Sequence, residues 1–189
     1  MKKSRILKMA IVFNQIMIAF IILMVVCLVA AVIHWYLDPK SYSLVELTQG
    51  FNAGYGIGGF KIHRIEPAQD TGKVLLNQVS SITIILLALR GVLFAVLTIL
   101  IFRSITRILK SIRSVKTFYD ANIANLKYTG RCMLLISILS FFNLGEWQDT
   151  WQINFSLPLG PILLTLFAYV LAEVFTEGKH LLEDKNMIV

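Results

Sequence analysis

Charged residues are scarce in this chain. They make up 15% of its 189 residues, whereas 57% are hydrophobic, and the mean hydropathy is +0.72. A soluble domain carries about a quarter charged residues, so this composition excludes a water-soluble fold. The net charge of +7 comes from cations in short segments beside apolar runs. That pattern is typical of a membrane protein, and we expect no direct binding of nucleic acid.

Residues that hold metals or act as catalytic nucleophiles are also few. The chain has two cysteines and three histidines, with no Cys-x-x-Cys pair and no H-E-x-x-H or G-x-S-x-G motif. Zinc therefore has no ligand set. The sequence predicts no metal site, no cofactor and no enzymatic activity.

Long apolar runs are abundant instead, and they set the fold class. A helix of about 20 residues crosses the ~30 Å hydrocarbon core of a bilayer. Runs of this length cover about 9–36, 83–102, 128–147 and 153–175. The first is longer than the 7–15 residue core of a secretory signal, so we expect an uncleaved span. The sequence predicts an all-α integral membrane protein, with residues 1–189 forming one domain built as a four-transmembrane-helix bundle.

Lysine and arginine concentrate on one side of these predicted spans. Four precede the first span and about seven lie between the second and the third, whereas the acidic turn 146–152 has none. The positive-inside rule then predicts a multi-pass protein of the cell (inner) membrane, with both termini on the cytoplasmic side. Residues 103–121 are predicted to form a basic amphipathic helix on the cytoplasmic surface. Residues 176–189 are predicted to form a cytoplasmic tail.

The segment 38–81 is the one sizeable loop, predicted outside the cytoplasm. Residues 42–48 and 60–65 alternate with period two around a glycine-rich stretch, which predicts a small β-hairpin. Gly54, Gly56 and Gly59 spell G-x-G-x-x-G. The dinucleotide fingerprint also needs a strand before it and a helix after it within a βαβ unit, so nucleotide binding is not predicted.

One arginine lies inside a predicted span. Arg90 is about seven residues, or roughly 10 Å, below the outer end of the second span, where a charge is costly. Ser137, Ser140 and Asn143 on the third span are its predicted partners, the last two one helical turn apart, and Glu146 completes the polar cluster. Three interpretations stay open: a structural arginine, a group lining a ligand or ion path, and outward snorkelling. Asn14 and Gln15, near the inner end of the first span, bond either a neighbouring helix or lipid headgroups.

The C-terminal stretch LAEVFTEGKHLLEDKNMIV resembles the ending of the bacterial membrane family known as domain of unknown function 2975. Asn122, Asn125, Leu126 and Gly130 also resemble the start of that family's third span, and the resemblance covers about 99–189. The chain departs from the family at 115–118, which reads Val-Lys-Thr-Phe where the family often has a Gly-x-Pro-Phe-like step. The resemblance implies a four-span inner-membrane protein without known chemistry, often encoded beside a small helix-turn-helix regulator.

Two functions follow as hypotheses. The first is a regulatory or sensory membrane partner of such a regulator, and the second is a small transporter, channel subunit or immunity-type membrane protein. For the first, the candidate cytoplasmic partner surface comprises Arg107, Lys110, Arg113, Glu173, Glu177, Gly178, Glu183 and Asp184. A structural role for its acidic part stays open, with Glu173, Glu177 and Gly178 capping the last helix. Besides the lipid bilayer, a second copy of the chain stays open as a partner.

Overall fold

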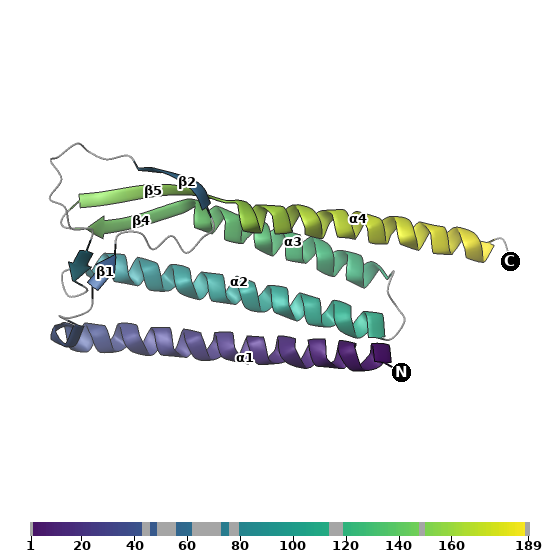
Figure 1. Cartoon of the computed structure of the whole chain (residues 1–189), viewed down its shortest axis with the longest axis horizontal. Coiled ribbons are helices and arrows are strands. Elements are labelled where there is room, and N and C mark those ends of the chain that lie inside the picture. The colour runs from purple at the N-terminus through teal and green to yellow at the C-terminus, as the bar shows by residue number, and fades with distance from the viewer. Residues whose placement is uncertain are drawn as a thin grey trace. The chain divides into compact units, whose positions relative to one another are not determined.

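The computed structural model describes residues 2–42, 46–48, 56–61, 73–75, 80–113, 119–147 and 150–187. Helices dominate this described part (Figure 1). The α-helices are α1 (Lys2–Leu37), α2 (Ser81–Arg113), α3 (Asp120–Phe141) and α4 (Leu159–Met187). Three of them, α1, α2 and α4, are long and apolar enough to cross a membrane. The prediction of a helical membrane protein is confirmed in this coarse form, and the predicted four-helix bundle is compatible with it.

Apolar side chains are exposed along these helices. On α1 only Ile11, Asn14 and Trp35 are buried among the side chains that the structure describes. On α4 a similar exposed series includes Leu163 and Phe167. Soluble monomers rarely leave contiguous apolar patches of more than a few hundred Å² in water. Contact with lipid makes such exposed apolar side chains favourable.

The outer ends of the predicted third and fourth spans differ from the prediction. Helix α3 ends at Phe141, and the chain continues as strand β4 (Phe142–Trp147). Strand β5 (Thr150–Pro158) follows, and α4 begins only at Leu159. The spans predicted over 128–147 and 153–175 were therefore wrong at these ends. Pairing explains the strands, because β4 and β5 form an antiparallel hairpin from Phe142↔Phe155 to Trp147↔Thr150.

The predicted surface helix also differs. Helix α2 continues without a break from Ser81 to Arg113, so residues 103–113 extend the second span instead of forming a separate helix. No glycine or proline lies between Phe102 and Arg113 to end the helix. Residues 114–118 lie outside the described part, and 120–121 already belong to α3.

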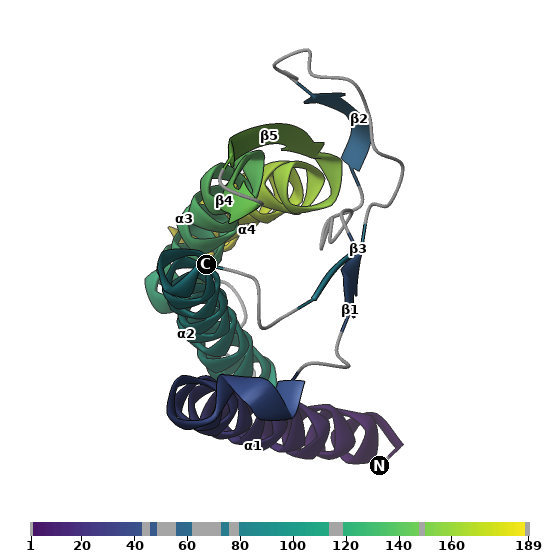
Figure 2. The same ribbon diagram turned by 90° about the vertical axis from the view of Figure 1, so that its left-hand side faces the viewer.

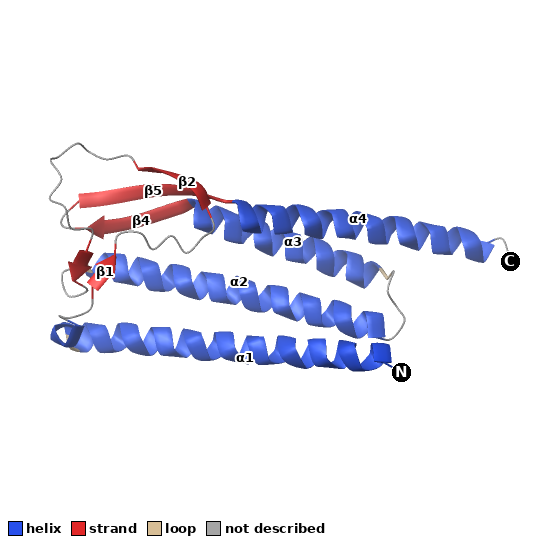
Figure 3. Cartoon of the chain, viewed as in Figure 1, coloured by secondary structure: helices blue, strands red, loops and turns tan. Residues whose placement is uncertain are grey.

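Strands in the segment 38–81 pair differently from the predicted hairpin. After the short 3₁₀ helix η1 (Pro39–Tyr42) come β1 (Glu46–Thr48), β2 (Gly56–Lys61) and β3 (Lys73–Leu75). Strand β1 pairs with β3, and β2 joins β5 and β4 in an antiparallel sheet of order β2-β5-β4 (Figures 2 and 3). Gly56 and Gly59 thus lie within a strand and not in a phosphate-binding turn. Gly54 lies outside the described residues.

The chain divides into two compact units. The helical unit comprises Met1–Ile22, Ala95–Ile136 and Pro161–Val189, and the strand unit comprises Leu23–Phe94 and Ser137–Gly160. The core of the helical unit joins three helices through Ile108, Ile123, Leu126, Leu171, Ala172 and Phe175. In the strand unit, the rings of Phe141, Phe142 and Phe155 contact one another with centroids 4.9–5.7 Å apart.

Glycine allows a close approach of helices within each unit. A Cβ on Gly130 of α3 would lie 3.0 Å from the Tyr169 ring of α4, and a Cβ on Gly91 of α2 would lie 3.1 Å from Leu28 of α1. Small residues at such positions let helix backbones pack tightly in lipid. Gly130 is one of the residues on which the family resemblance rests, and here it fixes the α3–α4 spacing.

Candidate functional site

The structure describes only part of the predicted cluster around Arg90. Arg90 is half-buried in the strand unit, and its Cζ lies 5.5 Å from the centroid of the Phe94 ring on the same helix. Ser140 is buried, and its carbonyl oxygen accepts a hydrogen bond of 2.9 Å from Ser156 of β5. Asn143 and Glu146 lie on β4, so the helical spacing that linked Ser140 to Asn143 was wrong. The side chains of Asn143 and Glu146 lie outside the described ones.

Asn14 forms a polar contact between α1 and α2 in the helical unit. Its side chain is buried, and its amide donates to the carbonyl oxygen of Phe102 at 2.6 Å and to the hydroxyl of Thr106. Thr106 in turn donates to the same Phe102 carbonyl at 2.9 Å. Of the two alternatives for Asn14, the structure shows the bond to a neighbouring helix.

A second set of polar contacts joins α2 to α3. The buried Ser104 donates to the Asn125 carbonyl oxygen at 2.9 Å, and the Thr129 hydroxyl reaches that carbonyl at 2.9 Å and Ser104 at 3.1 Å. One turn further, Asn122 donates to Ser111 at 2.9 Å. Sequence reasoning missed this set. Its signal was the spacing of Asn122, Asn125 and Thr129, which places three polar residues on one helix face.

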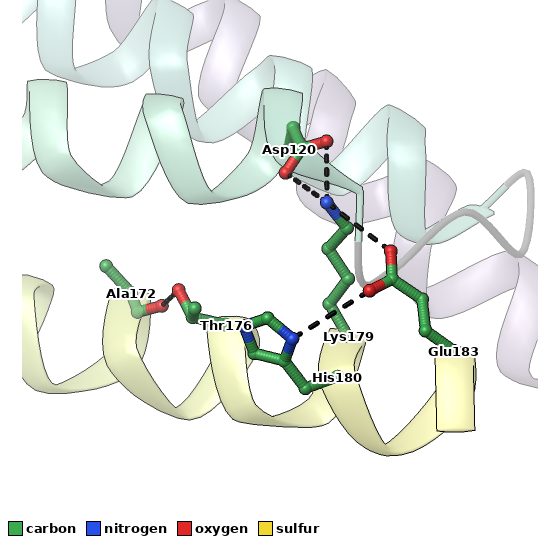
Figure 4. Close-up of polar contacts among 6 residues, drawn as sticks. All are labelled: Asp120, Ala172, Thr176, Lys179, His180 and Glu183. Carbon is green, nitrogen blue, oxygen red and sulfur yellow. Dashed lines mark hydrogen bonds and ion pairs between the residues drawn. The ribbon is translucent and has the colours of Figure 1, made fainter. Parts of the chain in front are cut away.

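An ion pair connects the charged end of α4 to the start of α3. The Lys179 ammonium lies 2.8 and 2.9 Å from the two carboxylate oxygens of Asp120, in the first turn of α3 (Figure 4). Glu183 lies 3.6 Å from Lys179 and 3.8 Å from His180. Lys179 and Asp120 were not among the predicted site residues, because nothing in the sequence links two positions 59 residues apart.

The residues of the predicted partner surface all belong to the helical unit. Those that are exposed are Arg107, Lys110, Glu173, Glu177, Glu183 and Asp184, and Gly178 is half-buried. Arg113 is the last residue of α2, and its side chain lies outside the described ones. Gly178 does not end the last helix, since α4 continues to Met187. The capping role considered for it was therefore wrong.

The buried polar groups hold helices together. Among the described residues, every buried side-chain nitrogen or oxygen has a hydrogen-bond partner. The same part of the chain contains no group of three or more His, Cys, Asp or Glu residues placed to hold a metal ion. The hydrogen bonds of Asn14 join α1 to α2, and those of Ser104 and Thr129 join α2 to α3. The hydrogen-bonding capacity of these buried groups is thus used within the protein.

Comparisons with known proteins found no counterpart. No protein-family model, no curated protein and no solved structure matches the chain. The resemblance to the family of domain of unknown function 2975 stays a prediction that rests on the residues quoted for it.

Proposed function

We propose that this chain is a non-enzymatic regulatory membrane protein, whose helical unit docks a small helix-turn-helix regulator in the cytoplasm. The proposal has three parts, which are the orientation of the helices, the surface that α4 offers, and the identity of the partner. Each rests on a different observation.

Charge supports an orientation with both termini in the cytoplasm. The helical unit contains the start of α1, the end of α2, the start of α3 and the end of α4. It holds 13 of the 18 lysines and arginines but 5 of the 11 acids. Positive charge marks the cytoplasmic side of a membrane protein. Four membrane crossings, the third begun by α3 and the fourth completed by α4, bring all four helix ends to that side.

The length of α4 is the main observation that supports a docking surface on this helix. Its 29 residues span about 43 Å at ~1.5 Å per residue, against ~30 Å of hydrocarbon. At least about nine residues therefore extend beyond the lipid core as helix. The contact between Lys179 and Asp120 holds this extension to α3. The extension exposes Leu181, which is 69% exposed, beside charged side chains, and an apolar residue with a charged surround is typical of a protein contact.

Charge and the family resemblance together favour a helix-turn-helix regulator as the partner. Glu173, Glu177 and Asp184 are exposed and lie on one face of α4, at spacings of four and seven residues. A helix-turn-helix regulator presents cations to the DNA backbone. An acidic helix face is complementary to that surface, and complementary charge speeds and orients association. The resemblance adds that such regulators are often encoded beside members of the family.

Co-purification tests this proposal. The tagged protein and the helix-turn-helix regulator that the resemblance places beside it are produced together, solubilised in mild detergent and captured through the membrane protein. We expect the full chain to retain the regulator. A chain without 183–189, and a full-length Glu177→Lys/Asp184→Lys variant, should each retain roughly tenfold less.

A charge reversal in the other unit supplies the control. Asp38 is exposed in the strand unit, and Asp38→Lys should retain as much regulator as the wild type. The full-length charge-reversal variant guards against loss of folding by truncation, provided that its melting temperature matches that of the wild type. Equal retention by the wild type and both variants of α4 would refute docking at this helix.

A further inference from the structure

The cations of α2 differ in their depth in the membrane. Because α2 is continuous, Arg103 follows the last apolar residue directly, Arg107 lies about 6 Å further along the axis, and Lys110 about 10 Å. Headgroups add roughly 5–7 Å to each side of the hydrocarbon core. Arg103 and Arg107 therefore fall within the headgroup layer of the cytoplasmic leaflet, and Lys110 lies beyond it.

The face of α2 that carries Arg103 and Arg107 lies between its hydrogen bonds to α1 and to α3. One side of α2 bonds Asn14 of α1 through Phe102 and Thr106, and the opposite side bonds α3 through Ser104. At about 100° per residue, both arginines lie on the face between these two contacts. Both are exposed, and neither takes part in an ion pair among the described residues.

Tyr128 of α3 borders this face. Its side chain is 42% exposed, and it directly precedes Thr129, which bonds Ser104 of α2, the residue that follows Arg103. A phenol hydroxyl can donate a hydrogen bond to a phosphate oxygen. Two exposed guanidinium groups and one exposed phenol thus lie at headgroup depth on neighbouring helices.

We propose that Arg103, Arg107 and Tyr128 form a binding site for the phosphate of an anionic phospholipid in the cytoplasmic leaflet. Guanidinium groups bind phosphate oxygens through paired, charge-assisted hydrogen bonds. Basic residues at the cytoplasmic surface attract anionic lipids. The depth of the two arginines selects lipid over a soluble phosphate compound. The site is separate from the docking surface on α4 and does not depend on the proposed regulator.

Lipid titration of the full-length protein in detergent tests the site. The melting temperature is followed while phosphatidylglycerol or phosphatidylcholine is added, and the midpoint of each titration gives an apparent dissociation constant. We expect the wild type to bind phosphatidylglycerol more tightly than phosphatidylcholine. Arg103→Gln/Arg107→Gln should weaken phosphatidylglycerol binding about tenfold, and Tyr128→Phe about twofold.

Lys127→Gln/Arg131→Gln is the matched control. These exposed cations are one turn apart on α3, and they flank Thr129, which bonds Ser104, so they lie at the same depth as the two arginines. This control removes the same charge without changing Arg103, Arg107 or Tyr128, and it should weaken binding clearly less than the α2 pair does. Arg103→Lys/Arg107→Lys preserves charge but not paired hydrogen bonds, and an intermediate loss of about threefold is expected even if the glutamine variant fails to fold.

Three results would overturn the proposal. One is a wild type without preference between the two lipids. Another is equal weakening by the α2 pair and the α3 pair, which would show a diffuse positive field instead of a site. The third is stabilisation by soluble glycerol phosphate at the same concentration as by phosphatidylglycerol, which would show a site for free phosphate.

Discussion

At the scale of single residues, Asn14 provides a sharp test of how α1 is held. Its buried amide bonds the Phe102 carbonyl and the Thr106 hydroxyl of α2. Hydrogen bonds between helices in lipid contribute about 0.6 kcal/mol each and at most about 1.7. We expect Asn14→Leu to lower the free energy of unfolding by about 0.5–2 kcal/mol, measured by unfolding in mixed detergent micelles.

Gln15 is the matched control for this substitution, because it is the next residue on α1 and is exposed. Gln15→Leu should leave the free energy of unfolding unchanged or raise it slightly, since it removes a polar group from a lipid-facing position. If Asn14→Leu and Gln15→Leu have the same effect, the contact between Asn14 and α2 does not stabilise the protein.

At the scale of elements, the end of α4 depends on its contact with α3. Lys179 is partly exposed and pairs with the largely exposed Asp120, so the contact orders the helix end more than it stabilises the whole protein. We expect Lys179→Gln to increase amide hydrogen exchange over 177–187 by roughly twofold. High salt should reduce the difference from the wild type, because it screens exposed charges.

The control for the Lys179–Asp120 contact removes a negative charge from α4 instead of a positive one. Glu177 is exposed on the same helix, and Glu177→Gln should leave exchange over 177–187 close to that of the wild type. An identical increase in both variants would mean that any loss of charge loosens this helix end, and the specific role of Asp120 would be lost.

The elements also show which parts of the fold could be predicted from the sequence. Helices α1, α2 and α4 follow from apolar runs that match the bilayer thickness, a local property. The boundary at Phe141 does not, because Phe142–Trp147 becomes a strand through its pairing with Thr150–Phe155. Strand β2 pairs with β5, a segment about 95 residues later, and such a partner has no local signal.

The candidate sites divide in the same way. Exposure of Glu173, Glu177 and Asp184 follows from helical spacing and charge, which are local. The contacts of Asn14 with α2, of Ser104 with α3 and of Lys179 with Asp120 join residues far apart in the chain. The sequence could suggest that Asn14 bonds a helix but not which one. The prediction for Arg90 was wrong in its partner spacing because it assumed that α3 continues to Trp147.

At the scale of the whole molecule, the uneven charge of the two units predicts which side of the membrane each faces. The helical unit holds most of the cations, and the strand unit holds five of them with six acids. Reversing the protein would require the cation-rich helix ends to cross the membrane, which the positive-inside rule disfavours. We therefore expect Ser41, exposed in the strand unit, outside the cytoplasm, and Asp184, exposed in the helical unit, inside it.

Cysteine labelling measures this orientation directly. In a Cys27→Ala/Cys132→Ala background, Ser41→Cys should react with a membrane-impermeant maleimide on intact spheroplasts, whereas Asp184→Cys should react only after permeabilisation. Both positions are exposed, so a difference in labelling reports the side of the membrane and not burial. Labelling of Asp184→Cys on intact spheroplasts would place α4 outside, where no cytoplasmic regulator could reach it. The docking proposal would then fail together with the orientation, and so would the assignment of Arg103 and Arg107 to the cytoplasmic leaflet.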